Sequence, residues 1–413
     1  MPASLNATAV DALADEPLDW RYKGLPAAWW GRTPAQVCAD ARDPFDDGAV
    51  GPLCVLSSSA LAHNGALMAE WCQRRGVELA PHGKTHMAPQ LLARQLDAGA
   101  RAVTVATISQ ARTFRAFGVR SVVLANELVD AAGLRWLAAE LDEHADFEFV
   151  CWVDSLAGVA LMSAALEAAG ARRPVDVCVE VGMAGGRSGC RDAATVDEVA
   201  RAAIASAQLR LVGVSGYEAA VSHDVTPQAR ATVRDYVREV RAATERLLPT
   251  FESDEVIVTA GGSTYFDIVA DELTGWDGDR KVHTILRSSC YLTHDDGLYQ
   301  RSSPLPALRP ALTVWAQVTS QPEDDLALVT MGRRDVSFDQ DLPAPYGLVD
   351  SAVTKLNDQH AYLRVGQADR GVVEVGAWIE FGVSHPCTVF DKWQMIPVLD
   401  DDRRVVELVR TFF

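Results

Sequence analysis

Lys84 follows a short apolar run, within the segment PHGKTH at residues 81–86. Two further apolar runs lead into TAGGST, residues 259–264, and RSSCY, residues 287–291. Small residues and hydroxyls in such segments let backbone N–H groups approach a phosphate group. A lysine amine beside a phosphate-binding loop is what pyridoxal phosphate, a Schiff-base cofactor, requires. Separately, each segment is typical of a turn or a solvated lysine, so the hypothesis depends on the fold bringing them together.

A second pair of reactive side chains, His385 and Cys387, stands near the end of the chain in FGVSHPC. If this segment is extended, residues two apart point to the same face of the strand. An imidazole nitrogen and a thiolate are typical zinc ligands, and two protein ligands leave positions open for water or substrate. On spacing alone, a packed histidine and an unligated cysteine remain the simpler alternative.

From about residue 53 to 290, predicted strands alternate with predicted helices, and these elements must position the reactive residues. Near-continuous apolar runs separated by Ala-rich amphipathic stretches predict a parallel sheet covered by helices, and eight or nine such units favour a (β/α)8 barrel. The runs begin at Leu53, Val77, Ala102, Ser121, Phe147, Val175, Arg210, Val256 and His283. Barrel enzymes carry their chemistry at the carboxyl ends of the strands, where Lys84 and both phosphate-binding candidates fall.

After about residue 300 the pattern changes to short alternating strands with dense proline, which predicts a mostly antiparallel β domain. We therefore expect an N-terminal segment at residues 1–45 that packs on the β domain, a barrel at 46–295 and the β domain at 296–413. A G-x-G-x-x-G sequence opening a helix is absent, which argues against a dinucleotide-binding fold.

The composition of the chain argues against several classes of protein. The chain has 413 residues, 48% hydrophobic and 23% charged, with a formal net charge of −18. An acidic surface repels phosphate backbones and anionic lipid, so we expect neither a nucleic-acid nor a membrane partner. The first 20 residues lack the basic and apolar regions of a secretory signal, and the 8 cysteines form no dense framework. These features favour a cytoplasmic protein with reduced thiols.

The segment PHGKTHMAPQLLARQLDAGA resembles the lysine segment of the fold-type III pyridoxal phosphate enzymes, in the D-serine dehydratase and D-threonine aldolase branch of the alanine racemase-like superfamily. The likeness extends from about Pro52 to the end of the chain and is greatest to bacterial amino acid deaminase or D-serine deaminase-like proteins. It implies that Lys84 carries the cofactor. It also implies that Arg187, in VEVGMAGGRSG, faces the pyridine nitrogen and that Tyr217 lies near the ring.

The phosphate element of this family appears here as VTAGGS and SSCY, in which Ser289 and Cys290 replace a glycine and a serine. The cofactor-binding residues implied by these two segments are Thr259, Gly261, Gly262, Ser289, Cys290 and Tyr291. His82 and His86, which flank the lysine, are expected to orient local hydrogen bonds. Asp339 lies in a loop that the resemblance implies is near the active site, without a chemical step of its own.

The resemblance also bears on the histidine and cysteine pair. D-serine dehydratases carry H-x-C at this place and bind zinc, whereas the aldolase branch carries H-x-D and prefers harder divalent ions. It therefore implies that His385 and Cys387 bind Zn²⁺ and that the chemistry is of the dehydratase type.

From this resemblance we expect a homodimeric dehydratase or deaminase, dependent on pyridoxal phosphate and zinc. Its substrate is a D-β-hydroxy amino acid such as D-serine, which gives a 2-oxo acid and ammonia, with Lys84 as the base that takes the α-proton. D-Serine, D-threonine and D-3-hydroxyaspartate all remain open as substrates. A D-threonine or 3-hydroxyaspartate type of aldolase, a racemase on the same fold, and a non-catalytic pyridoxal phosphate carrier remain as alternatives.

Overall fold

The computed structural model describes residues 5–222 and 224–413. The chain forms two compact units, one containing residues 69–84 and 95–289, the other residues 6–68, 85–94 and 290–413. We call them the barrel unit and the β unit. Among the described residues, no helix combines the length and the apolarity that a membrane span requires.

The barrel unit contains an eight-stranded sheet in which all neighbours are parallel, in the order β2-β9-β8-β7-β6-β5-β4-β3. Its strands are β2 Glu78–Leu79, β3 Val103–Val105, β4 Ser121–Glu127, β5 Glu148–Val153, β6 Val175–Val181, β7 Leu209–Gly216, β8 Glu255–Ala260 and β9 Lys281–Leu286. A parallel bridge between His82 and Thr104 joins the two ends of this order. The predicted parallel (β/α)8 barrel is confirmed.

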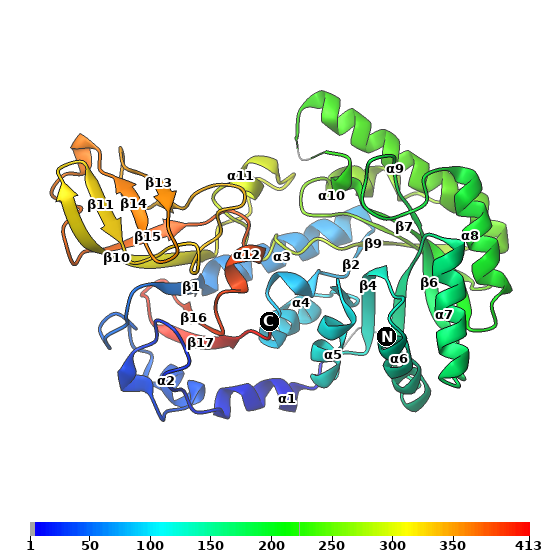
Figure 1. The fold of residues 1–413 in the computed structure, drawn as a ribbon, viewed down its shortest axis with the longest axis horizontal. Coiled ribbons are helices and arrows are strands. Elements are labelled where there is room, and N and C mark those ends of the chain that lie inside the picture. The colour runs from blue at the N-terminus through cyan, green and yellow to red at the C-terminus, as the bar shows by residue number, and fades with distance from the viewer. Residues whose placement is uncertain (1–4, 223) are drawn as a thin grey trace. The chain divides into compact units, whose positions relative to one another are not determined.

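Helices follow the barrel strands, and five of them, α5 to α9, begin at polar caps that the sequence supplies. Those of the barrel unit are α5 Ile108–Ala116, α6 Ala131–Glu143, α7 Leu156–Ala168, α8 Ala193–Ala205, α9 Pro227–Leu247 and α10 Phe266–Glu272. The side chains of Thr107, Asp130, Ser155, Asp192 and Thr226 each accept a first-turn backbone N–H, which stabilises a helix by about 1 kcal/mol. Figure 1 shows α7, α8 and α9 on the outer side of β6 and β7.

The interior of the barrel is filled by small and β-branched side chains together with one aromatic ring, Trp152, which is 1% exposed. The buried residues of this cluster are Ala80, Ala102, Val123, Val150, Trp152, Cys178, Val212 and Ile285. Burying each valine or isoleucine side chain contributes about 1.5–3 kcal/mol. This core holds the strand ends rigidly, which is what a site assembled from several strands needs.

The β unit contains a nine-stranded sheet in the order β13-β14-β11-β10-β1-β16-β17, with β15 pairing β10 and β12. Its strands are β1 Leu53–Ser57, β10 Leu312–Glu323, β11 Leu326–Val329, β12 Ala344–Pro345, β13 Ala352–Leu356, β14 Ala361–Arg364, β15 Trp378–Gly382, β16 Met395–Leu399 and β17 Val405–Arg410. Apart from the β1–β16 pair, the paired strands run antiparallel, so the predicted mostly antiparallel domain is confirmed.

The run from Leu53, predicted as a barrel strand, instead forms β1 of the β unit. Leu53 lies opposite Trp315 of β10, and Leu56 lies beside Val398 of β16. The prediction was wrong because a short buried apolar run has the same composition in either sheet, and periodicity does not name its partner strand.

The N-terminal residues of the β unit pack on this same sheet. Helix α1 spans Ala7–Asp11, and α2 spans Pro34–Asp40, beginning at a Thr33 capping box. The buried residues of this cluster are Leu18, Tyr22, Leu25, Trp29, Val37, Leu53, Val55, Met395, Leu399, Val405 and Leu408. Helix α3, Ser58–Arg75, and helix α4, Pro89–Asp97, carry the chain between the two units.

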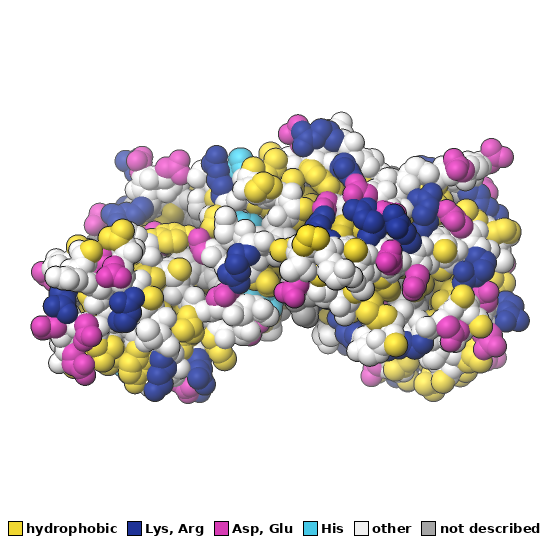
Figure 2. Space-filling model, turned by 90° about the horizontal axis from the view of Figure 1, so that it is seen from above, with side chains coloured by type: hydrophobic (Ala, Val, Ile, Leu, Met, Phe, Trp, Pro, Cys, Tyr) yellow, Lys and Arg dark blue, Asp and Glu magenta, His cyan; other side chains and the backbone are white. Residues whose placement is uncertain are grey.

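On the face shown in Figure 2, acidic and basic side chains are interspersed. The ion pairs of the chain include exposed ones such as Arg74 with Glu70, which lie 2.5 Å apart and one turn apart on α3. Exposed pairs of this kind typically contribute less than about 1 kcal/mol each, so the buried cores rather than the surface charges stabilise the units.

Candidate active site

A cavity of about 130 Å³ lies at the carboxyl ends of the barrel strands. Its lining consists of His82, Lys84, Ala106, Ala125, Asn126, Arg187, Tyr217, Gly261, Gly262 and Arg287. Five of the predicted cofactor-binding residues, from four separate strand ends, are therefore brought together here. The strand-end rule that placed them in the sequence holds in the structure.

The lysine turn is fixed against the barrel by close packing. Lys84 lies in a short 3-10 helix, Gly83–Thr85, that follows β2. A Cβ atom at Gly83 would lie 2.5 Å from the ring of Phe114, so only glycine lets the turn approach the barrel wall this closely. The Thr104 hydroxyl donates to the Ala80 carbonyl oxygen over 2.6 Å and fixes the strand before the turn.

The cavity is rich in positive charge although the chain as a whole is acidic. Lys84, Arg187 and Arg287 all line it. Burial and, after it, the Lys84, Arg287 and Arg187 charges lower the pKa of His82 well below its usual range, so this ring is neutral near pH 7. The buried Nδ1 atom of His82 has no hydrogen-bond partner among the described residues. A cavity with these charges and an unsatisfied polar atom suits an anionic ligand.

Arg287 is a site residue that the sequence interpretation did not assign. Its buried guanidinium donates to the Thr259 hydroxyl and to the Gly216 carbonyl oxygen, each over 2.7 Å. Thr259 in turn donates to the Ile285 carbonyl oxygen over 2.9 Å. Thr259 does not belong to the cavity lining found among the described residues; it positions Arg287 from behind. The sequence feature that could have identified Arg287 as a site residue is its position at the end of a predicted strand, as the first residue of RSSCY.

The predicted phosphate-binding glycines form an anion-binding loop. Gly261 has a φ of +95°, and a Cβ atom there would lie 2.7 Å from Leu286, so the position requires glycine. The backbone N–H groups of Gly261 and Gly262 donate to the two carboxylate oxygens of Glu218, over 2.8 and 2.6 Å. The amides therefore do point at an anion, but the anion in this structure is the fully buried Glu218.

The predicted SSCY element is divided between the two units. Ser289 ends the barrel unit and is buried, and its hydroxyl has no hydrogen-bond partner among the described residues. Cys290 and Tyr291 begin the adjoining part of the β unit and are also buried. The three cations of the cavity and the unsatisfied nitrogen of His82 fit a phosphate-bearing cofactor held by Lys84.

The expected extended geometry of the histidine and cysteine pair is wrong. Cys387 begins the short helix α12, Cys387–Phe390, and His385 has a φ of +55°. The sequence pattern failed here because Pro386 lies between them and starts the helical turn. The relative direction of the two side chains therefore comes from a turn rather than from the alternation of a strand.

A carboxylate and a backbone hydrogen bond hold His385 in place. Its Nδ1 atom lies 2.5 Å from an oxygen of Asp339, and its backbone N–H donates to Asp295 over 2.8 Å. A carboxylate on one ring nitrogen fixes the ring and leaves the other nitrogen, Nε2, to coordinate a metal ion. His86, in contrast, is buried, and its Nδ1 accepts the Ala88 backbone N–H over 2.9 Å, a local structural bond as expected.

Two sulfur atoms lie together in the β unit. The Cys387 sulfur is 3.6 Å from that of Cys290 and 3.2 Å from the Thr85 hydroxyl oxygen. No three His, Cys, Asp or Glu side chains of the described residues form a ready-made metal site. The thiol pair and the carboxylate-supported His385 nevertheless offer the donor chemistry of a thiophilic divalent ion.

A partly buried acidic cluster near the carboxyl end of β4 was not recognised from the sequence. Burial and, after it, the neighbouring Glu180 and Asp154 carboxylates raise the pKa of Glu127 to about 8. Glu127 is therefore largely protonated near pH 7.

Comparison with known proteins is decisive for the family. Residues 56–266 match the family model "Alanine racemase, N-terminal domain", and residues 311–399 match "Putative serine dehydratase domain". The chain belongs to the alanine racemase-like family of fold-type III pyridoxal phosphate enzymes. The cavity of this alanine racemase-like barrel, with Lys84 in its lining, is therefore where a cofactor of this family is expected.

Relatives within the alanine racemase-like family carry out more than one reaction. D-Threonine aldolase of Arthrobacter sp is 29% identical over 352 residues, which cover 85% of this chain and 89% of the aldolase. 3-Hydroxy-D-aspartate aldolase of Paracoccus denitrificans (strain Pd 1222) is 26% identical, covering 82% and 87%. A D-threo-3-hydroxyaspartate dehydratase variant, with a cysteine replaced by alanine and in a metal-free form, has a TM-score of 0.73 at 22% identity, covering 88% and 98%.

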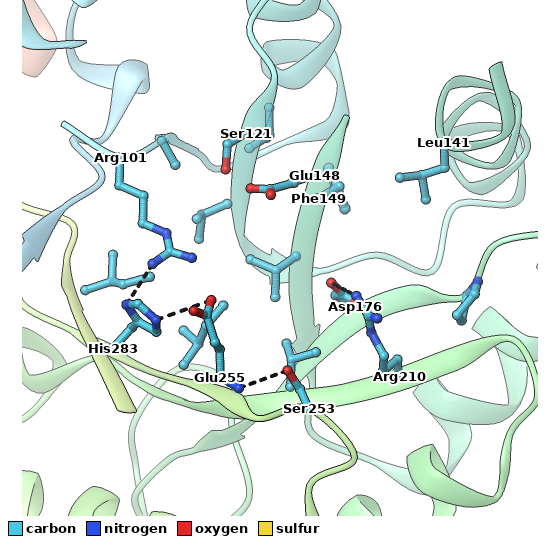
Figure 3. A pocket seen from close by; sticks show the side chains of 18 of the residues that line it. Arg101, Ser121, Leu141, Glu148, Phe149, Asp176, Arg210, Ser253, Glu255 and His283 are labelled. Atoms are coloured by element: carbon cyan, nitrogen blue, oxygen red, sulfur yellow. Dashed lines mark hydrogen bonds and ion pairs between the residues drawn. The ribbon is translucent and has the colours of Figure 1, made fainter. Parts of the chain in front are cut away.

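A second cavity, of about 340 Å³, lies at the opposite, amino ends of the strands of this alanine racemase-like barrel. Figure 3 shows His283 between Arg101 and Glu255 on one side and Asp176 beside Arg210 on the other. These charges neutralise one another, for example in the Arg210–Asp176 pair at 2.6 Å. Barrel enzymes act at the carboxyl ends of their strands, so the smaller, cationic cavity is the candidate active site.

Proposed function

We propose that this protein is a lyase that converts a D-3-hydroxy amino acid into a 2-oxo acid and ammonia. The α-proton and the β-hydroxyl leave as water, and hydrolysis of the product then releases ammonia. The observation that carries the proposal is the cationic cavity around Lys84, on a chain that also holds a carboxylate-supported histidine and a cysteine at His385 and Cys387.

Pyridoxal phosphate, when bound, withdraws electrons from the Cα atom of an amino acid and so acidifies its α-proton. Lys84 holds the cofactor through its amine and then takes this proton as the general base. Arg187, whose guanidinium carbon lies 4.6 Å from the Tyr217 ring centroid, would hold the pyridine nitrogen of the cofactor and would favour its unprotonated form, because a guanidinium is a cation that donates and does not accept hydrogen bonds. Arg287, which lines the cavity, would provide positive potential for the phosphate group, whereas the Gly261 and Gly262 amides already donate to Glu218.

His385 and Cys387 are the proposed ligands of a zinc ion, which supplies Lewis-acid activation of an oxygen atom. Asp339 fixes the ring of His385 through Nδ1 and raises the basicity of its other nitrogen. A relative with a cysteine replaced by alanine is known in a metal-free form, which supports a cysteine ligand in the family.

Retro-aldol cleavage is the second candidate, because the two relatives that are 29% and 26% identical are both aldolases of D-3-hydroxy amino acids. Cleavage begins with loss of the β-hydroxyl proton and gives glycine and an aldehyde. The H-x-C pattern of this chain favours elimination, since the aldolase branch that it resembles carries H-x-D.

A product assay on the purified holoenzyme separates the two reactions. D- and L-forms of serine, threonine and 3-hydroxyaspartate are incubated with enzyme, and ammonia, 2-oxo acid and glycine are measured. We expect ammonia and 2-oxo acid in equal amounts from a D-isomer. Glycine without ammonia would replace the proposal with the aldolase, and faster turnover of L-serine than of every D-isomer would contradict it.

We further propose that the protein is a cytoplasmic homodimer. None of the 8 cysteines, all of which lie among the described residues, forms a disulfide bond, which suits a reducing compartment. Light scattering of the eluted holoenzyme tests the dimer, since a mass near twice 44.6 kDa is expected.

A further inference from the structure

We propose that Cys290 is a second thiolate ligand of the metal ion, so that the centre is a Cys2His site rather than a His-x-Cys pair. This inference rests on the proposed function only in placing a metal ion at Cys387. It assigns Cys290 to the metal and removes it from the phosphate-binding residues that the sequence suggested.

The distance between the two sulfur atoms carries the inference. Zinc binds thiolates at about 2.3 Å, so two sulfurs at a tetrahedral angle lie about 3.8 Å apart. The Cys290 and Cys387 sulfurs are 3.6 Å apart, within a few tenths of an ångström of the distance expected for two thiolates on one zinc ion. Neither thiol forms a disulfide bond, and this separation is well beyond the roughly 2.05 Å of such a bond.

Backbone hydrogen bonds hold the two cysteine segments next to each other. The Asp295 carboxylate accepts the backbone N–H of His385 over 2.8 Å with one oxygen and that of Tyr299 over 2.8 Å with the other. The Asp296 N–H donates to the Val383 carbonyl oxygen over 2.9 Å. The segment after Cys290 and the segment before Cys387 are therefore connected independently of the sulfurs, so the thiol pair is preorganised for a ligand.

The Thr85 hydroxyl, 3.2 Å from the Cys387 sulfur, can donate to a thiolate, which stabilises its charge. Two thiolates balance the charge of a divalent ion, and one imidazole adds a third ligand, which leaves a fourth position open, as in catalytic zinc sites. The described residues contain no preformed three-ligand group, so the thiol pair is the part of the site that the structure already forms, and His385, whose ring Asp339 holds, is the proposed third ligand. A sulfur-rich site selects zinc over magnesium, manganese and calcium.

The test uses zinc itself and the full-length protein with its cofactor. Zinc X-ray absorption counts the sulfur ligands, and competition with a chromogenic chelator measures zinc affinity. We expect two sulfurs in the wild type and one in Cys290→Ser. We also expect an affinity loss of at least about 10- to 100-fold, the size that even outer-shell changes cause. Cys38→Ser, at a half-buried free cysteine of the same unit, is the matched control and should change neither value.

One sulfur in the wild type overturns the inference, even if Cys290→Ser does not fold. Unchanged affinity in a folded Cys290→Ser also overturns it, as does a wild type that binds no zinc. The number of sulfur ligands and the release of ammonia test the metal centre and the proposed reaction separately. Two sulfurs without ammonia release would support the Cys2His centre and reject the elimination. Ammonia release with one sulfur ligand would support the elimination and reject the Cys2His centre.

Discussion

The two candidate regions of this molecule are built in different ways. The cavity of the barrel unit collects residues from the ends of β2, β3, β4, β6, β7, β8 and β9, and the barrel interior below them is packed with buried apolar residues. The thiol pair of the β unit lies on loops that are held by hydrogen bonds to Asp295. A site built on strand ends follows from strand order, whereas a site built on loops depends on individual hydrogen bonds between segments far apart in sequence.

The most damaging change to the barrel region should be Lys84→Ala. Loss of the amine that holds the cofactor and takes the α-proton should lower ammonia release by at least about 1000-fold, within the range for removing a general base. Borohydride reduction should attach the cofactor to Lys84 in the wild type. Lys281→Ala, at an exposed lysine at the other end of the barrel, should retain activity. Reduction that labels a different lysine would refute the assignment.

The corresponding change in the β unit is Cys387→Ala. Elimination should fall by about 100- to 10,000-fold, since Lewis-acid help is worth several kcal/mol and each ~1.4 kcal/mol is tenfold in rate. Cofactor uptake, measured by visible absorption, should stay unchanged. Chelation should give the same pattern, and added zinc should reverse it. Full activity in the metal-free wild type would remove the metal from the reaction.

Glu218→Gln tests how far the glycine loop depends on its carboxylate. The buried Glu218 accepts two backbone N–H groups, and an amide directs its own N–H toward one of them. The cofactor-free protein should lose about 1–3 kcal/mol of unfolding free energy, the cost of an unsatisfied buried polar group. Denaturant unfolding measures this, and Glu245→Gln on exposed α9 surface serves as the control. Equal stability of the two variants would argue against a structural role for Glu218.

The smallest expected effect concerns Glu127 and pH. Because burial raises its pKa in the folded protein from 4.5 to about 8, the folded state binds the proton more tightly than the unfolded chain. This contribution to stability is fully present below about pH 4.5 and is lost as pH rises through about 8. Glu127→Gln should therefore flatten the fall of Tm between about pH 5 and 9, whereas the exposed Glu143→Gln should not. Identical profiles for the wild type and Glu127→Gln would contradict the raised pKa.

The sequence by itself determined the barrel and the strand ends at which Lys84, Arg187, Tyr217 and the two glycines lie. Apolar periodicity and helix caps are local properties, and they specify which residues are buried and where each strand stops. The PHGKTH segment carried the resemblance to the family for the same reason, since its residues are contiguous.

Only the tertiary structure decided which distant segments meet. It placed the Leu53 strand in the β unit, Arg287 in the cavity, Glu218 on the glycine amides and Cys290 beside Cys387. Cys290 and Cys387 are 97 residues apart, and no local pattern connects them. Such pairings depend on strand partners and on buried hydrogen bonds that form only when the whole chain is folded, because a single position does not encode the identity of its partner.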